Sequence, residues 1–199
     1  MPRPFTRVLA VAAVLAVIAA GAALWTFFNA PKPQVTSSSG TASVGGPFTL
    51  VDQHGNTVTD QNFRGRWMVV FFGFTHCPDI CPTALNDMSM MMQDLGAAAD
   101  KVQPIFVTVD PERDTVQAMA DYVANFDPRI VALTGTPEQV AQAAKAYRVY
   151  YKKVPQGDGY TMDHTGILYV MDPQGRFMTH FTPNTPPADM AARIRKLLG

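Results

Sequence analysis

The sequence contains little cysteine, with 2 in 199 residues, and it has no excess of charge of either sign. Its 16 Lys and Arg residues balance 16 Asp and Glu residues, which leaves a net charge near zero. This balance argues against a nucleic-acid partner, because binding a phosphate backbone normally requires a basic face. Two cysteines are also too few for a disulfide scaffold. They leave two simple uses, a single disulfide or a shared metal ion.

An apolar segment at residues 8–28 predicts a transmembrane helix. Only Thr26 interrupts it, and at about 1.5 Å per residue it spans the roughly 30 Å hydrocarbon core of a membrane. Two arginines precede it, which favours a cytoplasmic N-terminus at residues 1–7. The alternative is a signal peptide cleaved near residues 20–22, but the apolar run continues past these small residues. We therefore predict an uncleaved single-pass anchor in the inner membrane.

The remainder of the chain is expected on the far side of that membrane. No cysteine directly follows the apolar segment, which excludes a lipid anchor on an N-terminal cysteine. An oxidising space such as a bacterial periplasm is then the predicted compartment. Residues 29–46, rich in Pro, Ser, Thr and Gly, predict a flexible linker, and residues 47–199 a folded domain.

The domain alternates strand and helix patterns. In order, they predict a hairpin at 48–58, a buried strand at 66–72, a helix at 83–95, a strand at 102–109, a helix at 116–126, a strand at 131–133, a helix capped by Thr136, an extended stretch at 147–154, a loop tip at 156–159, a hairpin at 167–181 and a helix at 187–198. This alternation predicts an α/β fold with a central mixed sheet flanked by helices. By analogy of layout, a cysteine pair at the first long strand-to-helix junction matches a thioredoxin-like fold.

Both cysteines lie in residues 73–82, which read GFTHCPDICP. A buried strand leads into this stretch and a helix leads out of it. We expect Cys81 in the first helical turn, where free backbone N–H groups and the helix dipole favour a thiolate. A thiolate is the form of cysteine that attacks disulfides and binds soft metal ions.

The spacing of Cys77 and Cys81 limits what the pair can do. A structural disulfide would close a loop of five residues, worth about 2 kcal/mol against about 3 for fifteen residues, so a purely structural role is disfavoured. Thioredoxin-type exchange ordinarily uses two residues between the cysteines, whereas this pair has three. At i and i+4 the sulfurs share one helix face. The pair can form a disulfide, and it can also hold one ion.

A metal site needs a third ligand beyond the two thiolates. The candidates are His54, His76, His164 and His180. We expect His54 in an exposed turn and His180 in ordinary strand packing. The side chain of His76 is expected to diverge from that of Cys77, on which it could act electrostatically. In a thioredoxin-like layout His164 lies in a loop facing the cysteine junction, and Asp163 could orient its imidazole.

Two thiolates and one imidazole suit a soft ion. Cu(I) matches best, the same set can hold Cu(II), and Zn(II) would require a fourth ligand or water. Methionines recur at helical spacing in 83–95, which predicts core packing rather than a copper-binding set, with Met90 off the stripe and exposed.

The chain resembles the Sco/SenC family of copper-binding assembly factors. The resemblance rests on GFTHCPDICP at 73–82, DPERDT at 110–115 and the Asp-His-Thr sequence at 163–165. It covers the domain from about residue 47 to the C-terminus, and the N-terminal anchor fits it as well. The cysteine stretch is specific, whereas the Asp-His pair alone would be a weak signal.

The resemblance implies a membrane-tethered thioredoxin fold that helps mature the dinuclear copper centre of cytochrome c oxidase. The implied copper ligands are Cys77, Cys81 and His164. The implied function is a copper chaperone for the copper-site subunit of the oxidase, with other copper chaperones or thiol reductases as further partners. The alternative is a thiol–disulfide reductase in which Cys77 attacks and Cys81 resolves. A peroxidase is a third alternative, against which Thr75 lies two rather than three positions before Cys77.

Overall fold

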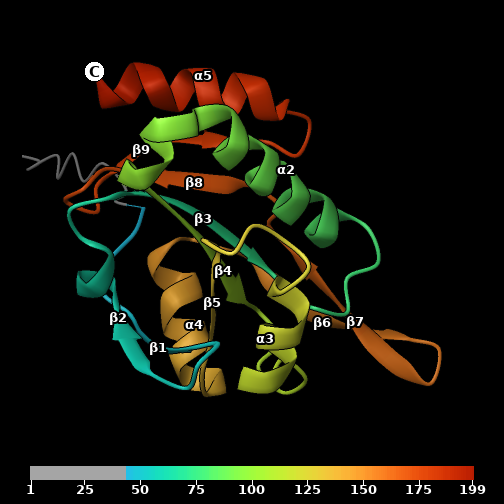
Figure 1. Cartoon of the computed structure of the whole chain (residues 1–199). Helices are drawn as coiled ribbons and strands as arrows, with labels where there is room; N and C mark the ends of the chain where they lie inside the picture. The colour runs from blue at the N-terminus through green and yellow to red at the C-terminus, as the bar shows by residue number, and fades with distance from the viewer. Residues whose placement is uncertain (1–43) are drawn as a thin grey trace, which may run out of the picture. The chain divides into compact units, whose positions relative to one another are not determined.

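The computed structural model describes residues 44–199, and Figure 1 labels their helices and strands. The strands are β1 (Thr49–Asp52), β2 (Thr57–Thr59), β3 (Trp67–Gly73), β4 (Val102–Thr108), β5 (Val131–Thr134), β6 (Tyr151–Gln156), β7 (Gly159–His164), β8 (Leu168–Met171) and β9 (Phe177–Phe181). The α-helices are α2 (Ile80–Leu95), α3 (Val116–Val123), α4 (Pro137–Ala146) and α5 (Pro187–Leu198). Asp60–Phe63 (η1) and Gly96–Lys101 (η2) are 3-10 helices.

Seven strands form one sheet in the order β2-β1-β5-β4-β3-β8-β9. The neighbours β3 and β4 are parallel, and β8 pairs antiparallel with the other side of β3. All of β4 is buried, as is all of β3 except its first residue, because these continuous apolar runs are covered on both faces. Figure 1 shows α2 and α5 over one face of the sheet and α3 and α4 over the other. The predicted α/β fold, with a mixed sheet between helices in a thioredoxin-like layout, is confirmed for this part of the chain.

The helices form near their predicted positions, although α3 ends at Val123 rather than at residue 126. Thr136 caps α4, since its side chain accepts a hydrogen bond from the N–H of Gln139 while the Gln139 side chain accepts one from the N–H of Thr136. The helix α2 begins at Ile80 rather than at residue 83. Its stripe of Leu and Met residues is fully buried, and Met90 is exposed, so the core-packing interpretation is confirmed.

A second sheet was not expected from the sequence. The strands β6 and β7 pair with each other in a separate two-stranded hairpin, in which Tyr151 lies opposite His164. The predicted extended stretch at 147–154 thus becomes a strand that starts at Tyr151, and residues after the loop tip form its partner. Most residues of this hairpin are exposed or half-buried, so they show no alternation of apolar and polar positions. His164 therefore ends a strand instead of lying in a loop.

The predicted cytoplasmic segment (1–7), the predicted anchor (8–28) and most of the predicted linker (29–46) lie outside the described residues. Within residues 44–199, none of the helices combines the length and the apolar character needed to cross a membrane.

Candidate metal centre

The two cysteines flank the start of α2. Cys81 lies in the first helical turn, as expected, and is buried, while Cys77 lies in the loop before the helix and is half-buried. Both are free thiols. The strand before them ends at Gly73, where an added Cβ would lie 2.8 Å from the Sγ of Cys81. Only a residue without a side chain allows the strand end to approach the sulfur this closely.

His164 reaches the same place from the end of β7. Its Nε2 lies 3.5 Å from the Sγ of Cys81, and the ligand atoms of Cys77, Cys81 and His164 all lie within 4.8 Å of one another. Its Nδ1 lies 3.1 Å from the carbonyl oxygen of Thr165, which can only accept a hydrogen bond. Nδ1 therefore carries the proton, and Nε2 presents its lone pair to the sulfurs.

The two thiols differ in their ease of ionisation. The Cys81 thiol donates a hydrogen bond to the Cys77 sulfur, which lowers the pKa of Cys77 to about 5 from an ordinary 9.0. The backbone N–H of Cys81 also donates to that sulfur at 3.4 Å. The same pairing, together with burial, raises the pKa of Cys81. The prediction of a thiolate on Cys81 is therefore wrong, because its thiol is hydrogen-bonded to Cys77 and buried, while the free N–H of the first helical turn donates to the Cys77 sulfur.

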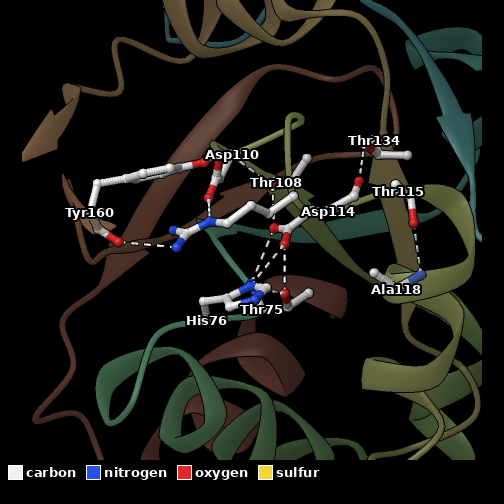
Figure 2. A network of polar contacts seen from close by, with 10 residues as sticks. Thr75, His76, Thr108, Asp110, Asp114, Thr115, Ala118, Thr134 and Tyr160 are labelled. Atoms are coloured by element: carbon white, nitrogen blue, oxygen red, sulfur yellow. Dashed lines mark hydrogen bonds and ion pairs between the residues drawn. The ribbon is translucent and has the colours of Figure 1, made fainter. Parts of the chain in front are cut away.

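A buried carboxylate holds the loop that carries Cys77. Asp114 is fully buried and accepts hydrogen bonds from the Thr75 N–H at 3.1 Å, the Thr75 hydroxyl at 2.6 Å and the Thr108 hydroxyl at 2.6 Å (Figure 2). Since the Thr75 hydroxyl donates to Asp114, it accepts from the Nδ1 of His76, which lies 3.0 Å away. Asp114 was not singled out from the sequence. Its place in the 110–115 motif was the available signal.

The remaining predicted residues lie at various distances from the centre. His76 projects to the surface with its ring on Thr75, and His54 lies in the exposed turn after β1. His180 is exposed on β9, where its ring stacks on Phe177. Asp163 is exposed on β7, and the hydrogen bond at the Nδ1 of His164 goes to the Thr165 carbonyl instead.

Two sulfurs and one imidazole nitrogen can therefore close on a single ion. The Cys77 sulfur already favours the thiolate form, and the tautomer of His164 leaves the lone pair of Nε2 available to a metal ion. Sulfur ligands select soft ions, of which Cu(I) accepts three ligands readily, whereas a structural Zn(II) site normally has four. Within residues 44–199, Cys77, Cys81 and His164 form the cluster of three or more His, Cys, Asp or Glu side chains whose ligand atoms lie close enough together to hold a metal ion.

Known sequences resemble this chain over most of its length. The family model SCO1/SenC matches residues 36–199. The protein sco1 of Schizosaccharomyces pombe is 39% identical, over 94% of this chain and 76% of the yeast protein. The human SCO1 homolog, described as mitochondrial, is 43% identical over 76% of this chain but only 52% of its own length. The chain thus spans about half of the human relative.

Solved structures share the fold. A copper-bound ScoI of Bradyrhizobium japonicum is 48% identical and superposes with a TM-score of 0.73, over 77% of this chain and 99% of that one. BsSco, described as a member of the Sco family of cytochrome c oxidase assembly proteins with a disulfide switch, is 26% identical with a TM-score of 0.63, over 77% of this chain and 92% of that one.

Proposed function

The chain belongs to the SCO1/SenC family, and we propose that it is a copper chaperone for cytochrome c oxidase assembly. In this proposal Cys77, Cys81 and His164 bind one copper ion and pass it to the subunit that carries the dinuclear copper centre. The observation that carries the proposal is the convergence of three ligand atoms within 4.8 Å from two distant parts of the sequence. The copper-bound relative of Bradyrhizobium japonicum supports the choice of ion.

The chemistry of the centre suits an ion that must be released again. Cys77 is ready to bind as a thiolate, and Cys81 becomes a ligand when its proton leaves. Three ligands leave copper open to an incoming ligand of the recipient, so that exchange can proceed one bond at a time. Cys77 and His164 are half-buried rather than enclosed, which lets the recipient approach.

The proposal includes the predicted anchor. Residues 8–28 would hold the chain in the inner membrane, residues 29–46 would act as a tether, and the domain at 47–199 would work in the periplasm. The apolar run and the arginines before it support this arrangement. Other copper chaperones or thiol reductases would supply the ion or keep the cysteines reduced.

Metal analysis of the reduced full-length chain in detergent tests the proposal. We expect close to one copper ion per chain, and weaker binding in Cys77→Ser, Cys81→Ser and His164→Ala. X-ray absorption at the copper edge should report two sulfurs and one nitrogen. Copper affinity that stays unchanged in all three variants would remove the basis of the chaperone function.

A second function, thiol–disulfide reduction, is favoured by the unequal thiols. The Cys77 thiolate would attack a disulfide sulfur of the recipient, forming a mixed disulfide and releasing one recipient thiolate. Cys81, after losing its proton, would attack the Cys77 sulfur and release the second thiolate. The recipient then gains two electrons and the chain holds a Cys77–Cys81 disulfide. The disulfide switch described for BsSco is in keeping with this chemistry.

A further inference from the structure

One loop, residues 110–114, contacts both halves of the metal centre. At its end, Asp114 bonds to Thr75 in the loop that carries Cys77. At its start, Asp110 accepts a hydrogen bond from the hydroxyl of Tyr160 at 2.9 Å. Tyr160 belongs to β7, the strand that ends at His164. Figure 2 shows Tyr160 beside Asp110 and Thr75 beside Asp114.

Arg113 closes a small ring of contacts between this loop and β7. Its Nε pairs with the carboxylate of Asp110, and its Nη1 donates to the backbone carbonyl of Tyr160 at 3.0 Å. The guanidinium carbon lies 3.8 Å from the centroid of the Tyr160 ring. Asp110 is only 2% exposed and the Arg113 side chain 24%, so these charge-assisted bonds are partly shielded from water and are stronger than ion pairs on the open surface.

A series of contacts between planar groups leads from Arg113 to the metal centre. Its guanidinium carbon lies 5.9 Å from the centroid of Phe74. The Phe74 ring in turn meets the His164 imidazole edge to face, with centroids 5.8 Å apart and planes at 89°. Tyr160 and His164 are four residues apart on one strand, so they lie on the same face of β7. The arginine thus contacts the strand that positions His164 and a ring that the imidazole packs against.

Few other charged or backbone contacts connect the β6–β7 hairpin to the rest of the described domain. Its two strands pair with each other and not with the seven-stranded sheet. The other ion pair between the hairpin and the loop joins Lys153 to Glu112, and both side chains are exposed. Exposed ion pairs contribute little, about 0–1 kcal/mol. Apolar packing of Met162, which is buried in the core, also anchors β7, so Arg113 supplies the charged part of the contacts that place this strand.

We propose that Asp110, Arg113 and Tyr160 form a latch that determines whether His164 reaches the cysteine sulfurs. These three residues touch no ligand atom, and they act by positioning the imidazole. With the latch closed the centre offers two sulfurs and one nitrogen, and with it open only the cysteine pair remains. The inference rests on the proposed copper function, because the latch matters to the extent that His164 is a copper ligand.

Removing the imidazole changes the preference of the centre between copper oxidation states. Two thiolates alone suit Cu(I), whereas an imidazole also stabilises Cu(II). Opening the latch should therefore weaken Cu(II) binding more than Cu(I) binding and raise the Cu(II)/Cu(I) potential. A residue needed only for folding would not select between the two oxidation states.

Arg113→Ala in the full-length chain tests the latch, with Glu112→Gln as the matched control in the same loop. The first readout needs no metal: hydrogen–deuterium exchange of the reduced, copper-free chain. We expect amides of 159–164 to exchange about tenfold faster or more in Arg113→Ala, since one hydrogen bond to a charged group changes an opening equilibrium by that order. Amides of β3 and α2 should keep their protection in both variants.

The second readout is electron paramagnetic resonance of the Cu(II)-loaded chain. Arg113→Ala should lose the nitrogen coupling of the unsubstituted chain and resemble His164→Ala, while Glu112→Gln should keep it. If Arg113→Ala does not fold, Arg113→Lys serves instead, because it keeps the charge but cannot contact Asp110 and the Tyr160 carbonyl together.

Two results would overturn the latch. One is unchanged exchange of 159–164 in Arg113→Ala, and the other is faster exchange with the nitrogen coupling intact. Failure of the proposed copper function looks different, because the unsubstituted chain itself would then show no nitrogen coupling. In that case the exchange measurement still decides whether Arg113 holds the hairpin.

Discussion

Nε2 of His164 lies 3.5 Å from Sγ of Cys81, although 83 positions separate the two residues in the sequence. Two elements bring them together. The strand β3 ends at the cysteine loop at one end of the sheet, and the separate β6–β7 hairpin positions the imidazole next to that loop. The ring then packs against Phe71 and Phe74, which fixes its orientation.

Because His164 is held next to the sulfurs, its substitution should lower copper affinity without disturbing the cysteine pair. Changes to residues around metal ligands typically lower metal affinity 10- to 100-fold. For His164, a direct ligand, we predict that substitution by Ala lowers copper affinity by roughly two orders of magnitude or more. Competition with a calibrated copper chelator measures it. His180→Ala is the matched control, because this exposed histidine lies on β9 away from the sulfurs, and its affinity should match that of the unsubstituted chain.

Much of this arrangement could be predicted from the sequence. The strand before the cysteines, the capped helix at Thr136 and the late hairpin all carry local patterns that specify them. The hairpin of β6 and β7 does not, because its residues are mostly exposed and lack a buried face. The position of His164 was predicted through layout and resemblance, whereas its tautomer depends on one carbonyl that only the three-dimensional structure reveals.

The protonation states of the two cysteines likewise could not be predicted from the sequence. A helix N-terminus predicts a thiolate nearby, but the sequence cannot tell which sulfur the free N–H groups will face. The structure directs the Cys81 N–H to Cys77. A spacing of four residues thus permits two assignments, and the backbone geometry of the loop decides between them.

The pKa of Cys77 leads to a prediction on pH dependence. Because its pKa is lowered to about 5, Cys77 should be a thiolate at neutral pH and lose reactivity only as the pH falls through about 5. An ordinary cysteine would lose it below 9.0. The rate of alkylation by iodoacetamide in the reduced, metal-free chain measures this midpoint. Cys81→Ala should move the midpoint upward, whereas Cys81→Ser, which keeps an O–H donor, should move it less. A midpoint near 9 in the unsubstituted chain would contradict the assignment.

Gly73 should not tolerate a side chain. An added Cβ would lie 2.8 Å from the Sγ of Cys81, 2.9 Å from Phe71 and 3.0 Å from Phe106. We predict that Gly73→Ala destabilises the domain by about 1–3 kcal/mol, the usual cost of overpacking a core, and displaces Cys81. Urea unfolding monitored by circular dichroism measures the stability. Gly159→Ala is the control, because a Cβ there meets only a carbonyl oxygen at 4.0 Å, and it should change stability far less.

Asp114 should matter to the centre without touching it. Asp114→Asn keeps the shape but replaces an acceptor by an amide N–H₂ that faces the donors of Thr75 and Thr108. Leaving a buried donor unpaired costs about 1–3 kcal/mol, so for the two donors we expect a loss of roughly 2–6 kcal/mol in unfolding free energy. Asp121→Asn, on an exposed part of α3, is the control and should stay within about 0.5 kcal/mol. Equal stability of the two variants would show that the buried carboxylate does not hold the cysteine loop.

The two proposed functions separate at His164. Among the named influences that lower the pKa of Cys77, the hydrogen bond from Cys81 contributes most and the electrostatic influence of His164 contributes least. Thiol–disulfide exchange should therefore survive His164→Ala with a rate within a few-fold of the unsubstituted chain, roughly the effect of a small change in thiolate fraction. Copper affinity, in contrast, should fall by about two orders of magnitude or more in the same variant. Stopped-flow reaction with an aromatic disulfide measures exchange, and Cys77→Ser supplies the inactive reference. If exchange and copper affinity fall together in His164→Ala, the imidazole must act on the sulfur itself, and the thiol chemistry would then depend on the ligand set rather than on the cysteine pair alone.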